Sequence, residues 1–296
     1  MNEYKRKLTK LTPKHEFFIG IDSDGCAFDT MELKHKECFT PNIIKVWNLQ
    51  AVSKYAREAS EFVNLYSKWR GINRWPALMM VLELLRERPE VIARGAKIPD
   101  TPRLRSFIAD DAFPKSNDGL KMYMEQFPDP ELAQAWTWTT AVNDSIAEMV
   151  HGLKPFPYLT DSLSFLRDKA DMIVVSATPV DALNTEWAGA DIAKYVNLIA
   201  GQEMGKKKEH LELAAKGKYD PDKILMIGDA PGDMNAAKAV GALFYPINPG
   251  QEDNSWQRFY EEAMPEFLAG TYSGAYEANV IAEFERLLPE IPPWKK

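Results

Sequence analysis

Cysteine is scarce in this chain of 296 residues, which contains only Cys26 and Cys38. Two cysteines cannot build the disulfide framework that stabilises many small secreted proteins, and a reducing compartment fits so low a number. Neither cysteine lies in a CxxC pair, and together with His35 they match no four-ligand zinc spacing. We therefore exclude a disulfide-stabilised fold and a structural zinc site.

Long apolar runs are absent as well. No stretch approaches the roughly 20 apolar residues that a membrane-spanning helix needs. The charged amino terminus also lacks the apolar segment of a secretory signal. We therefore expect no membrane partner and a cytoplasmic location.

Basic residues are in the minority, since 36 Lys and Arg stand against 43 Asp and Glu and give a net charge of -7. Nucleic-acid-binding domains are usually basic, so we expect small molecules as partners and no nucleic acid. A basic cluster near the start is the exception, and we interpret it as a solvated tail. It consists of Lys5, Arg6, Lys7, Lys10 and Lys14. The sequence does not specify the oligomeric state.

Short apolar runs predict the sheet. The run Phe17–Ile21, bounded by a turn, predicts a buried strand. Further strand candidates cover residues 172–176, 196–200, 224–228 and 242–247, with helical patterns between them. This alternation predicts an α/β fold, a Rossmann-like parallel sheet covered by helices on both faces.

A long helical block separates the first strand from the others. Apolar spacings of three, four and seven predict a helix over residues 130–150, Pro76 opens another that reaches Leu85, and residues 41–66 read similarly. We predict that this block, residues 31–153, is inserted into a core made of residues 1–30 and 154–250. The remaining residues, 251–296, are predicted to pack on the core as a helical extension.

Acidic residues follow two of the predicted strands. Asp22 and Asp24 come directly after the first strand, and Asp229 and Asp233 come after strand 224–228. Ligands of open α/β sheets bind at the carboxyl ends of the strands. Oxygen ligands of this kind suit Mg²⁺, although an acidic residue in a first helical turn, such as Asp233, also complements the helix dipole.

Two further motifs carry groups that could hold an anion. Ser176 places a hydroxyl at the end of the predicted strand 172–176. We interpret Thr178, which precedes Pro179, as an ordinary helix cap. Lys206, Lys207 and Lys208 open a helix, and a lysine run by itself is usually a solvated face.

Taken in order, these motifs resemble those of the haloacid dehalogenase-like hydrolase superfamily: DxD, a Ser or Thr after a strand, a Lys, and GDxxxD. The matching residues are Asp22-Ser23-Asp24, Ser176, one of the three lysines, and Gly228-Asp229 with Asp233. The segment Asp24–Asp29 is also similar to the DGxxxD loop of that family. The inserted block then looks like the helical cap domain of the family.

The resemblance implies a role for each matching residue. Asp22 would be the nucleophile that forms an aspartyl-phosphate, and Asp24 would be the general acid and base. Magnesium would be held by Asp22, Asp229 and the backbone carbonyl of Asp24, with Asp233 completing the acidic motif. Ser176 and the lysine would hold the phosphoryl oxygens.

Two departures from the family pattern stand out. Cys26 replaces the usual Thr after DxDG, and no Lys-Pro pair marks the catalytic lysine. We choose Lys207 from the helix register, and Lys206 and Lys208 remain alternatives. In the inserted block, Arg70 and Arg74 are predicted to help hold an anionic substrate, against the alternative of a packed helix junction.

An aspartate at the second DxD position resembles the phosphatase and phosphomutase branches of the family. We therefore predict a magnesium-dependent phosphohydrolase of small phosphorylated metabolites. One alternative is a phosphomutase of the beta-phosphoglucomutase type. A non-catalytic module that binds phosphate and metal is an alternative from another class.

Overall fold

The computed structural model describes residues 3–295 and divides them into two compact units. Unit 1 comprises residues 3–31 and 152–288, and unit 2 comprises residues 32–151 and 289–295. Among the described residues, no helix combines the length and the apolar character needed to cross a membrane.

Unit 1 is built on a five-stranded sheet in the order β3-β2-β1-β4-β5, and every neighbouring pair is parallel. The strands are β1 (Phe17–Ile21), β2 (Ala170–Val175), β3 (Leu198–Ala200), β4 (Ile224–Gly228) and β5 (Leu243–Pro246). The apolar runs of β2 and β4 are buried on both faces, as expected for a parallel sheet covered by helices. The predicted α/β fold is confirmed.

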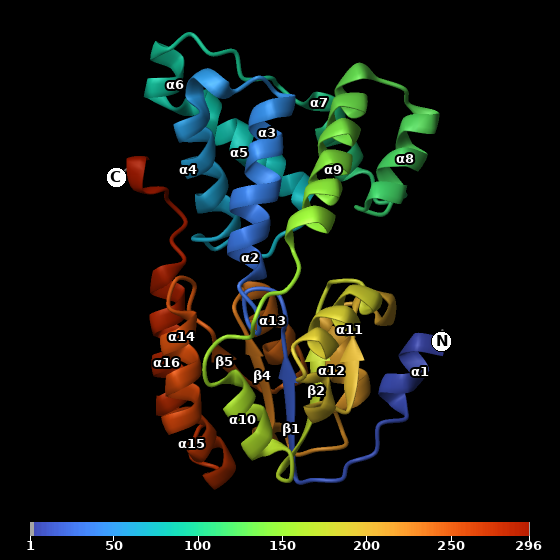
Figure 1. The fold of residues 1–296 in the computed structure, drawn as a ribbon, viewed down its shortest axis with the longest axis vertical. Coiled ribbons are helices and arrows are strands. Elements are labelled where there is room, and N and C mark those ends of the chain that lie inside the picture. Colours follow the sequence, from blue (N-terminus) through green and yellow to red (C-terminus); the bar gives the residue numbers. More distant parts are fainter. Residues whose placement is uncertain (1–2, 296) are drawn as a thin grey trace. The chain divides into compact units, whose positions relative to one another are not determined.

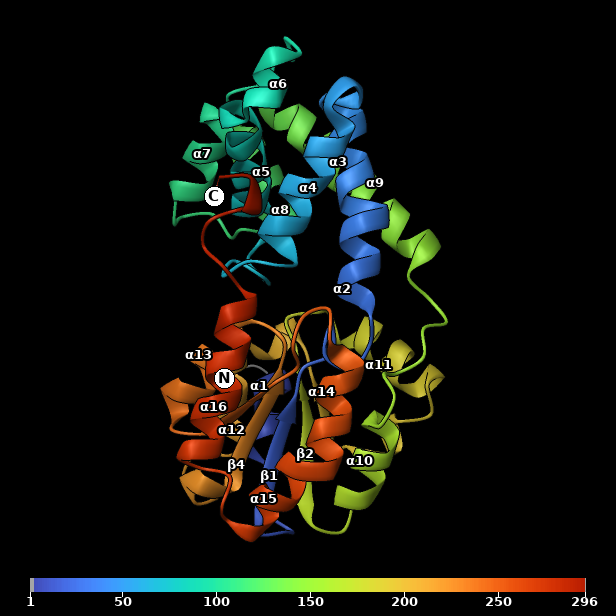
Figure 2. The ribbon, with the colours of Figure 1, turned by 90° about the vertical axis from the view of Figure 1, so that its left-hand side faces the viewer.

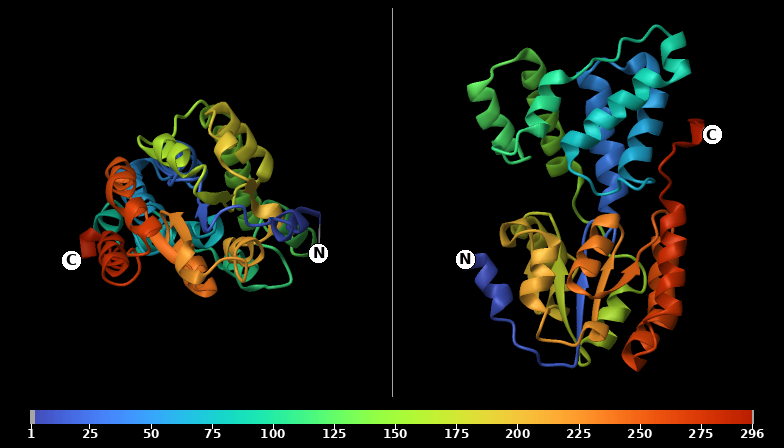
Figure 3. Two further views of the ribbon diagram at one scale, coloured as in Figure 1. Left: turned by 90° about the horizontal axis from the view of Figure 1, so that it is seen from below. Right: turned by 180° about the vertical axis from the view of Figure 1, so that it is seen from behind.

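Alternate residues of each strand point to opposite faces of the sheet. Ile19 and Ile21 pack in one cluster with α10, α11, α14 and α15, whereas Phe18 packs in another with α1, α12, α13 and α16. Figure 2 shows these two groups of helices on opposite sides of the sheet, and the right panel of Figure 3 shows the strands between them. The α-helices of unit 1 are α1 (Glu3–Thr9), α10 (Leu159–Leu166), α11 (Val180–Gly189), α12 (Lys207–Ala214), α13 (Pro231–Val240), α14 (Glu252–Arg258), α15 (Met264–Ala269) and α16 (Ala275–Leu287).

Short helical turns complete unit 1. They are η3 (Ala193–Tyr195), η4 (Gln202–Met204), η5 (Pro221–Lys223) and the π-helical η6 (Phe259–Ala263).

The strand order reverses between β1 and β4. The chain runs outward from β1 through β2 to β3, and the later strands lie on the other side of β1. A crevice forms at such a switch point, outside the carboxyl ends of the strands. Residues that follow β1 and β4 are therefore the ones that line it.

Unit 2 is helical and has an aromatic core. The ring of Trp138 lies 5.7 Å from that of Trp75, 5.9 Å from Trp47 and 6.0 Å from Phe39. Its elements are α2 (Thr30–Leu33, which begins in unit 1), η1 (Lys34–Phe39), α3 (Thr40–Val46), η2 (Gln50–Val52), α4 (Ser53–Asn64), α5 (Arg74–Glu87), α6 (Pro89–Ala93), α7 (Pro102–Ala109), α8 (Asn117–Gln126), α9 (Pro130–Met149) and η7 (Pro293–Lys295).

The helical pattern over residues 41–66 is interrupted in the structure. Helix α3 ends at Val46, and Asn48 adopts a positive φ of 54° before α4 begins. Asparagine tolerates this left-handed conformation better than most residues. Helix α9 agrees with the predicted helix over residues 130–150 to within one residue.

The described residues of the carboxyl-terminal tail, 289–295, group with unit 2, whereas the sequence analysis assigns all of 251–296 to an extension on the core. The ring of Trp294 lies 5.7 Å from that of Phe62, and the Arg88 guanidinium sits 4.4 Å above the Trp294 ring. Lys295 pairs with Glu87 at 2.5 Å. The red end of the ribbon in Figure 1 is this tail, and the chain therefore passes between the units three times.

The basic amino-terminal segment is docked on the core. Leu8 of α1 is fully buried, Lys5 pairs with Glu209 of α12 at 2.6 Å, and Lys218 donates to the Leu8 and Thr9 carbonyls. These contacts tie the segment to the helix that begins at Lys207. The solvated-tail interpretation is therefore wrong for Lys5 and for the docked backbone of the segment, whereas the side chains of Arg6, Lys7, Lys10 and Lys14 are exposed.

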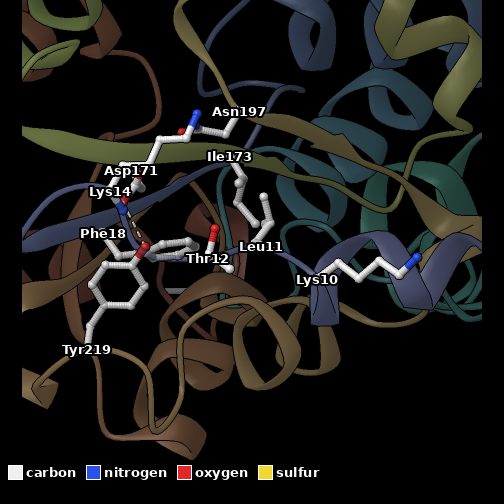
Figure 4. Close-up of a pocket in the computed structure, with 9 residues that line it drawn as sticks. All are labelled: Lys10, Leu11, Thr12, Lys14, Phe18, Asp171, Ile173, Asn197 and Tyr219. Atoms are coloured by element: carbon white, nitrogen blue, oxygen red, sulfur yellow. Dashed lines mark hydrogen bonds between the residues drawn. The ribbon is translucent and has the colours of Figure 1, made fainter.

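A small cavity of about 150 Å³ lies at the amino ends of the strands (Figure 4). The side chains of Asp171 and Tyr219 meet there through a hydrogen bond of 2.9 Å, and Asp171 also accepts the Lys14 amide at 2.8 Å. These hydrogen bonds hold the segment before β1 against the start of β2. The cavity is a structural feature at the edge of the sheet away from the switch point.

We predict that Trp294→Ala lowers the free energy of unfolding by about 2 kcal/mol, because it removes a half-buried ring and its cation–π contact with Arg88. Chemical denaturation measures this loss. Ile291→Ala is the control in the same tail, because Ile291 is 55% exposed and its loss is expected to change stability by less than about 0.5 kcal/mol. Equal stability of the two variants would show that the tail is not anchored by Trp294.

Candidate functional site

Three carboxylates meet at the carboxyl ends of β1 and β4. Asp22 follows β1, Asp229 follows β4, and Asp233 lies in the first turn of α13. One oxygen from each carboxylate lies within 4.8 Å of the others, and all three residues are buried. The parallel pairing of β1 with β4 brings together these residues, which are about 200 positions apart in the chain.

Lys207 joins this group from the start of α12. Its Nζ lies 2.6 Å from Asp22 Oδ2 and 2.6 Å from Asp233 Oδ1. Of the three candidate lysines, Lys206 is instead the N-cap residue of α12, and Lys208 pairs with Glu212 at 3.5 Å on the surface. The structure thus brings Lys207 to the acidic group.

Burial and charge shift the pKa values of this group. Burial raises the pKa of Asp22 well above its usual range, Asp233 and Asp229 raise it further, and Lys207 opposes them. Burial would lower the pKa of Lys207, but the charges of Asp22 and Asp233 outweigh it and raise that pKa. Lys207 therefore remains protonated at neutral pH.

The donor set fits a divalent cation. If all three carboxylates ionise, the group with its one ammonium has a net charge of -2, and buried charge that is not compensated is costly. Clustered carboxylate oxygens are ligands that Mg²⁺ prefers, with water and phosphate completing the coordination. Asp22, Asp229 and Asp233 are the described residues that could hold such an ion.

Asp24 turns its side chain to two hydroxyl groups. Thr30 donates to Asp24 Oδ1 at 2.5 Å, and Thr178 donates to Asp24 Oδ2 at 2.7 Å. The interpretation of Thr178 as a helix cap is wrong: the N-cap of α11 is Pro179, without a side-chain cap, and the Thr178 hydroxyl binds Asp24. The Asp24 carboxylate is thus oriented separately from the acidic group.

Ser176 lies at the end of β2, where its amide donates to the Ala200 carbonyl at 3.0 Å. Its buried hydroxyl accepts the Thr178 amide at 3.2 Å, which turns the chain toward α11. Gly201 is packed against this turn, since a Cβ there would lie 2.5 Å from the Thr178 carbonyl oxygen.

Arg70 and Arg74 belong to unit 2, and both are engaged within it. Buried Arg70 donates to the Leu65 carbonyl at 2.9 Å. Arg74 donates to Thr139 at 2.8 Å and to Asn143 at 2.9 Å. The residues of the acidic group all belong to unit 1.

Several residues near the DxD motif carry no local signal in the sequence. The indole of Trp187 donates to Ser23 at 2.9 Å, and that of Trp256 donates to the Cys26 carbonyl at 2.7 Å. Thr30 and Thr178 are also missed as partners of Asp24, because no local sequence pattern marks them. Each of these side chains would pass as an ordinary core or cap residue, because most of their partners lie more than 150 residues away.

Gly228 makes room for Asp233, and we predict that Gly228→Ala disrupts the acidic group. A Cβ at this position would lie 2.4 Å from Asp233 Cγ, so the carboxylate must move away from Lys207 and Asp229. We expect magnesium affinity, measured by calorimetry, to fall about tenfold or more. Gly232→Ala is the matched control because no atom lies within 4 Å of its Cβ position. Unchanged affinity in Gly228→Ala would contradict this packing.

His210, buried on α12 one turn after Lys207, predicts a pH-dependent stability. Burial lowers its pKa to about 4 from a usual 6.5. Below pH 6.5, His210 is protonated in the unfolded chain but stays neutral in the folded protein. The contribution of His210 to the free energy of unfolding is therefore fully present above pH 6.5 and decreases toward pH 4. The loss is on the order of 3 kcal/mol.

Urea unfolding at several pH values measures this effect as a difference between the wild type and His210→Gln. We expect the wild type to lose stability relative to the variant as the pH falls from 6.5 to 4. A constant difference across this range would show that His210 does not resist protonation in the folded state.

No protein-family model matches the chain. Phosphoglycolate phosphatase of Escherichia coli K12 is 32% identical over 106 residues, and that of Salmonella paratyphi A is 31% identical over the same length. Each match covers 32% of this chain, and the chain spans 42% of the length of these relatives.

Comparison with solved structures gives lower identities. A haloacid dehalogenase-like hydrolase from Streptococcus pneumoniae is 14% identical, with a TM-score of 0.39 over 81% of this chain and 90% of that one. A predicted phosphoglycolate phosphatase from Haemophilus somnus is 13% identical, with a TM-score of 0.45 over 79% of this chain and 86% of that one.

Three findings describe what this chain is similar to. The four motifs occur in order, the parallel sheet brings Asp22, Asp229 and Lys207 together at one edge, and the sequence is similar to that of phosphoglycolate phosphatases. The motifs and the site thus resemble those of the haloacid dehalogenase-like hydrolase superfamily, and the 106 matched residues are similar to phosphoglycolate phosphatases.

Proposed function

We propose that this protein is a magnesium-dependent phosphatase that hydrolyses phosphoric monoesters of small metabolites through a phosphorylated Asp22. The observation that carries the proposal is the placement of Asp22, a buried carboxylate at the switch point of the sheet, which pairs with Lys207 and lies beside two further buried carboxylates. The free, buried cysteines Cys26 and Cys38 agree with a cytoplasmic location.

In the proposed reaction an oxygen of Asp22 attacks phosphorus. Asp22 Oδ1 accepts the Ser23 amide at 2.7 Å and Oδ2 accepts from Lys207 at 2.6 Å, so the carboxylate has a fixed orientation. The O–P bond to Asp22 forms as the bond to the leaving oxygen breaks. The leaving oxygen takes a proton from Asp24.

A water molecule then hydrolyses the aspartyl-phosphate. Asp24 accepts a proton from this water, whose oxygen attacks phosphorus, and inorganic phosphate leaves while Asp22 is regenerated. Thr30 and Thr178 hold the Asp24 carboxylate in a defined place before the reaction. Lys207 and Ser176 are the proposed donors to the phosphoryl oxygens as negative charge develops.

Magnesium would be held by Asp22, Asp229 and the backbone carbonyl of Asp24, with Asp233 in support. When bound, it supplies positive charge that offsets the repulsion between the carboxylates and the phosphate. Asp233 accepts both Lys207 and the Ala230 amide, so its place in the proposal is to orient the lysine and the loop after β4.

For the substrate we propose a small phosphorylated carboxylic acid, of which 2-phosphoglycolate is the first candidate because the relatives are named for it. Arg70 and Arg74 are the proposed cations for the anionic substrate. A guanidinium has five N–H donors, so the bonds from Arg74 to Thr139 and Asn143 do not exhaust it.

The test is phosphate release from a panel of phosphorylated metabolites, including 2-phosphoglycolate, with magnesium and with EDTA. We expect Asp22→Asn to lower the rate by at least about 1000-fold, because the amide is not a nucleophile. Asp253→Asn, a change at an exposed position in α14, is the control and should retain full activity.

Other outcomes would point to the alternatives. Isomerisation of a sugar phosphate without phosphate release would replace the phosphatase by a mutase. Magnesium and phosphate binding with neither reaction would identify a binding module. Full activity of Asp22→Asn would remove Asp22 as the nucleophile.

A further inference from the structure

We propose that Ser23, the residue between the two aspartates of the DxD motif, is a positioning residue that fixes the Asp22 carboxylate. Its hydroxyl anchors it to Trp187 and Glu186 on α11. The assignment rests on the proposed role of Asp22 as the nucleophile.

The backbone of Ser23 connects the nucleophile to the loop that follows. Its amide donates to Asp22 Oδ1 at 2.7 Å. Its carbonyl accepts the amides of Ala27 at 2.9 Å, Phe28 at 3.2 Å and Cys26 at 3.3 Å. A displacement of Ser23 would therefore change the direction of the Asp22 carboxylate and the start of this loop together.

The side chain of Ser23 has one donor and one acceptor partner. The Trp187 indole donates to Ser23 Oγ at 2.9 Å, and Ser23 Oγ donates to Glu186 Oε2 at 3.0 Å. The direction of this chain is fixed because an indole N–H can only donate and an ionised carboxylate can only accept. The bond to the carboxylate is the stronger of the two, since one partner is charged.

Burial increases the energetic importance of the hydrogen bonds that the Ser23 hydroxyl makes. Ser23 and Trp187 are both fully buried, so neither hydroxyl nor indole can exchange its partner for bulk water. An apolar side chain at position 23 would be buried at a lower desolvation cost than a serine. The hydroxyl is therefore best explained by its two bonds to α11.

Helix α11 is itself tied to the DxD loop at two other points. The ring of Trp187 meets that of Phe28 edge-on at 6.1 Å. The turn before α11 carries Thr178, which donates to Asp24 at 2.7 Å. Helix α11 thus sets the place of Ser23 and of the Asp24 carboxylate at once.

The far end of the loop is anchored separately. The buried indole of Trp256, on α14, donates to the Cys26 carbonyl at 2.7 Å. That bond uses the backbone of the loop, whereas the bonds at Ser23 use its side chain. Loss of the Ser23 hydroxyl would therefore loosen the end of the loop next to Asp22, while the Trp256 bond still holds the Cys26 carbonyl.

The test compares Ser23→Ala with Ser162→Ala. Ser162 is the matched control because it is also fully buried and its hydroxyl donates to a backbone carbonyl, that of Tyr158 at 2.7 Å, on α10. Both variants are assayed at a temperature where thermal unfolding shows them folded. We expect Ser23→Ala to lower kcat about 10- to 100-fold with KM changed less than threefold, because misplacement affects the attack more than substrate binding. Ser162→Ala should leave both parameters within about twofold of the wild type.

A second readout does not need turnover. Beryllium fluoride with magnesium mimics a phosphoryl group on a carboxylate, and calorimetry measures its affinity. We expect about a tenfold loss in Ser23→Ala and no change in Ser162→Ala. Trp187→Phe, which keeps the ring and removes the indole N–H, should give a smaller loss of kcat and serves if Ser23→Ala does not fold.

Each outcome is decisive. If the wild type is active and Ser23→Ala or Trp187→Phe matches the Ser162→Ala control, the positioning role is overturned and the proposed phosphatase stands. A rise in the KM of Ser23→Ala of about 10- to 100-fold, with kcat unchanged, would also overturn the positioning role. A wild type that neither releases phosphate nor binds beryllium fluoride would overturn the proposed function and this assignment with it.

Discussion

The electrostatic balance around Asp22 is the constraint on which the rest of the site depends. Three buried carboxylates within 4.8 Å repel one another, and the Lys207 ammonium between Asp22 and Asp233 offsets only part of their charge. The parallel pairing of β1 with β4 and the start of α12 keep these groups together. The same imbalance makes the site suitable for a divalent cation.

The charged groups and the neutral hydrogen-bond donors of the site have different roles. Lys207 and the carboxylates set the charge of the site, whereas the Thr30 and Thr178 hydroxyls orient Asp24 and the Trp187 indole holds Ser23 beside Asp22. Thr30, Thr178 and the Trp187–Ser23 bond do not titrate near neutral pH. These contacts can therefore stay constant when the charge of the site changes.

Much of the fold and part of the site could be predicted from the sequence, because both follow from local patterns. Apolar runs located β1 and β4, and the acidic residues directly after them had to meet at one edge of a parallel sheet. The contacts of Thr178, Trp187 and Trp256 could not be predicted. They join segments more than 150 residues apart, and a Thr before a Pro or a Trp in a helix has a commoner local explanation. The break at Asn48 was also missed, since one left-handed residue does not disturb the apolar periodicity.

The tail that carries Trp294 affects the order in which unit 2 can be completed during synthesis. Helices α4 and α5 leave the ribosome early in synthesis, yet the surface around Phe62, Glu87 and Arg88 receives its last partner only after all of the core has been translated. Unit 2 is therefore not formed by one continuous segment of the chain. In a nascent chain, this surface of unit 2 lacks the tail until the strands β2 to β5 have been translated. Exchange of the helical unit between relatives would have to carry the tail along with residues 32–151.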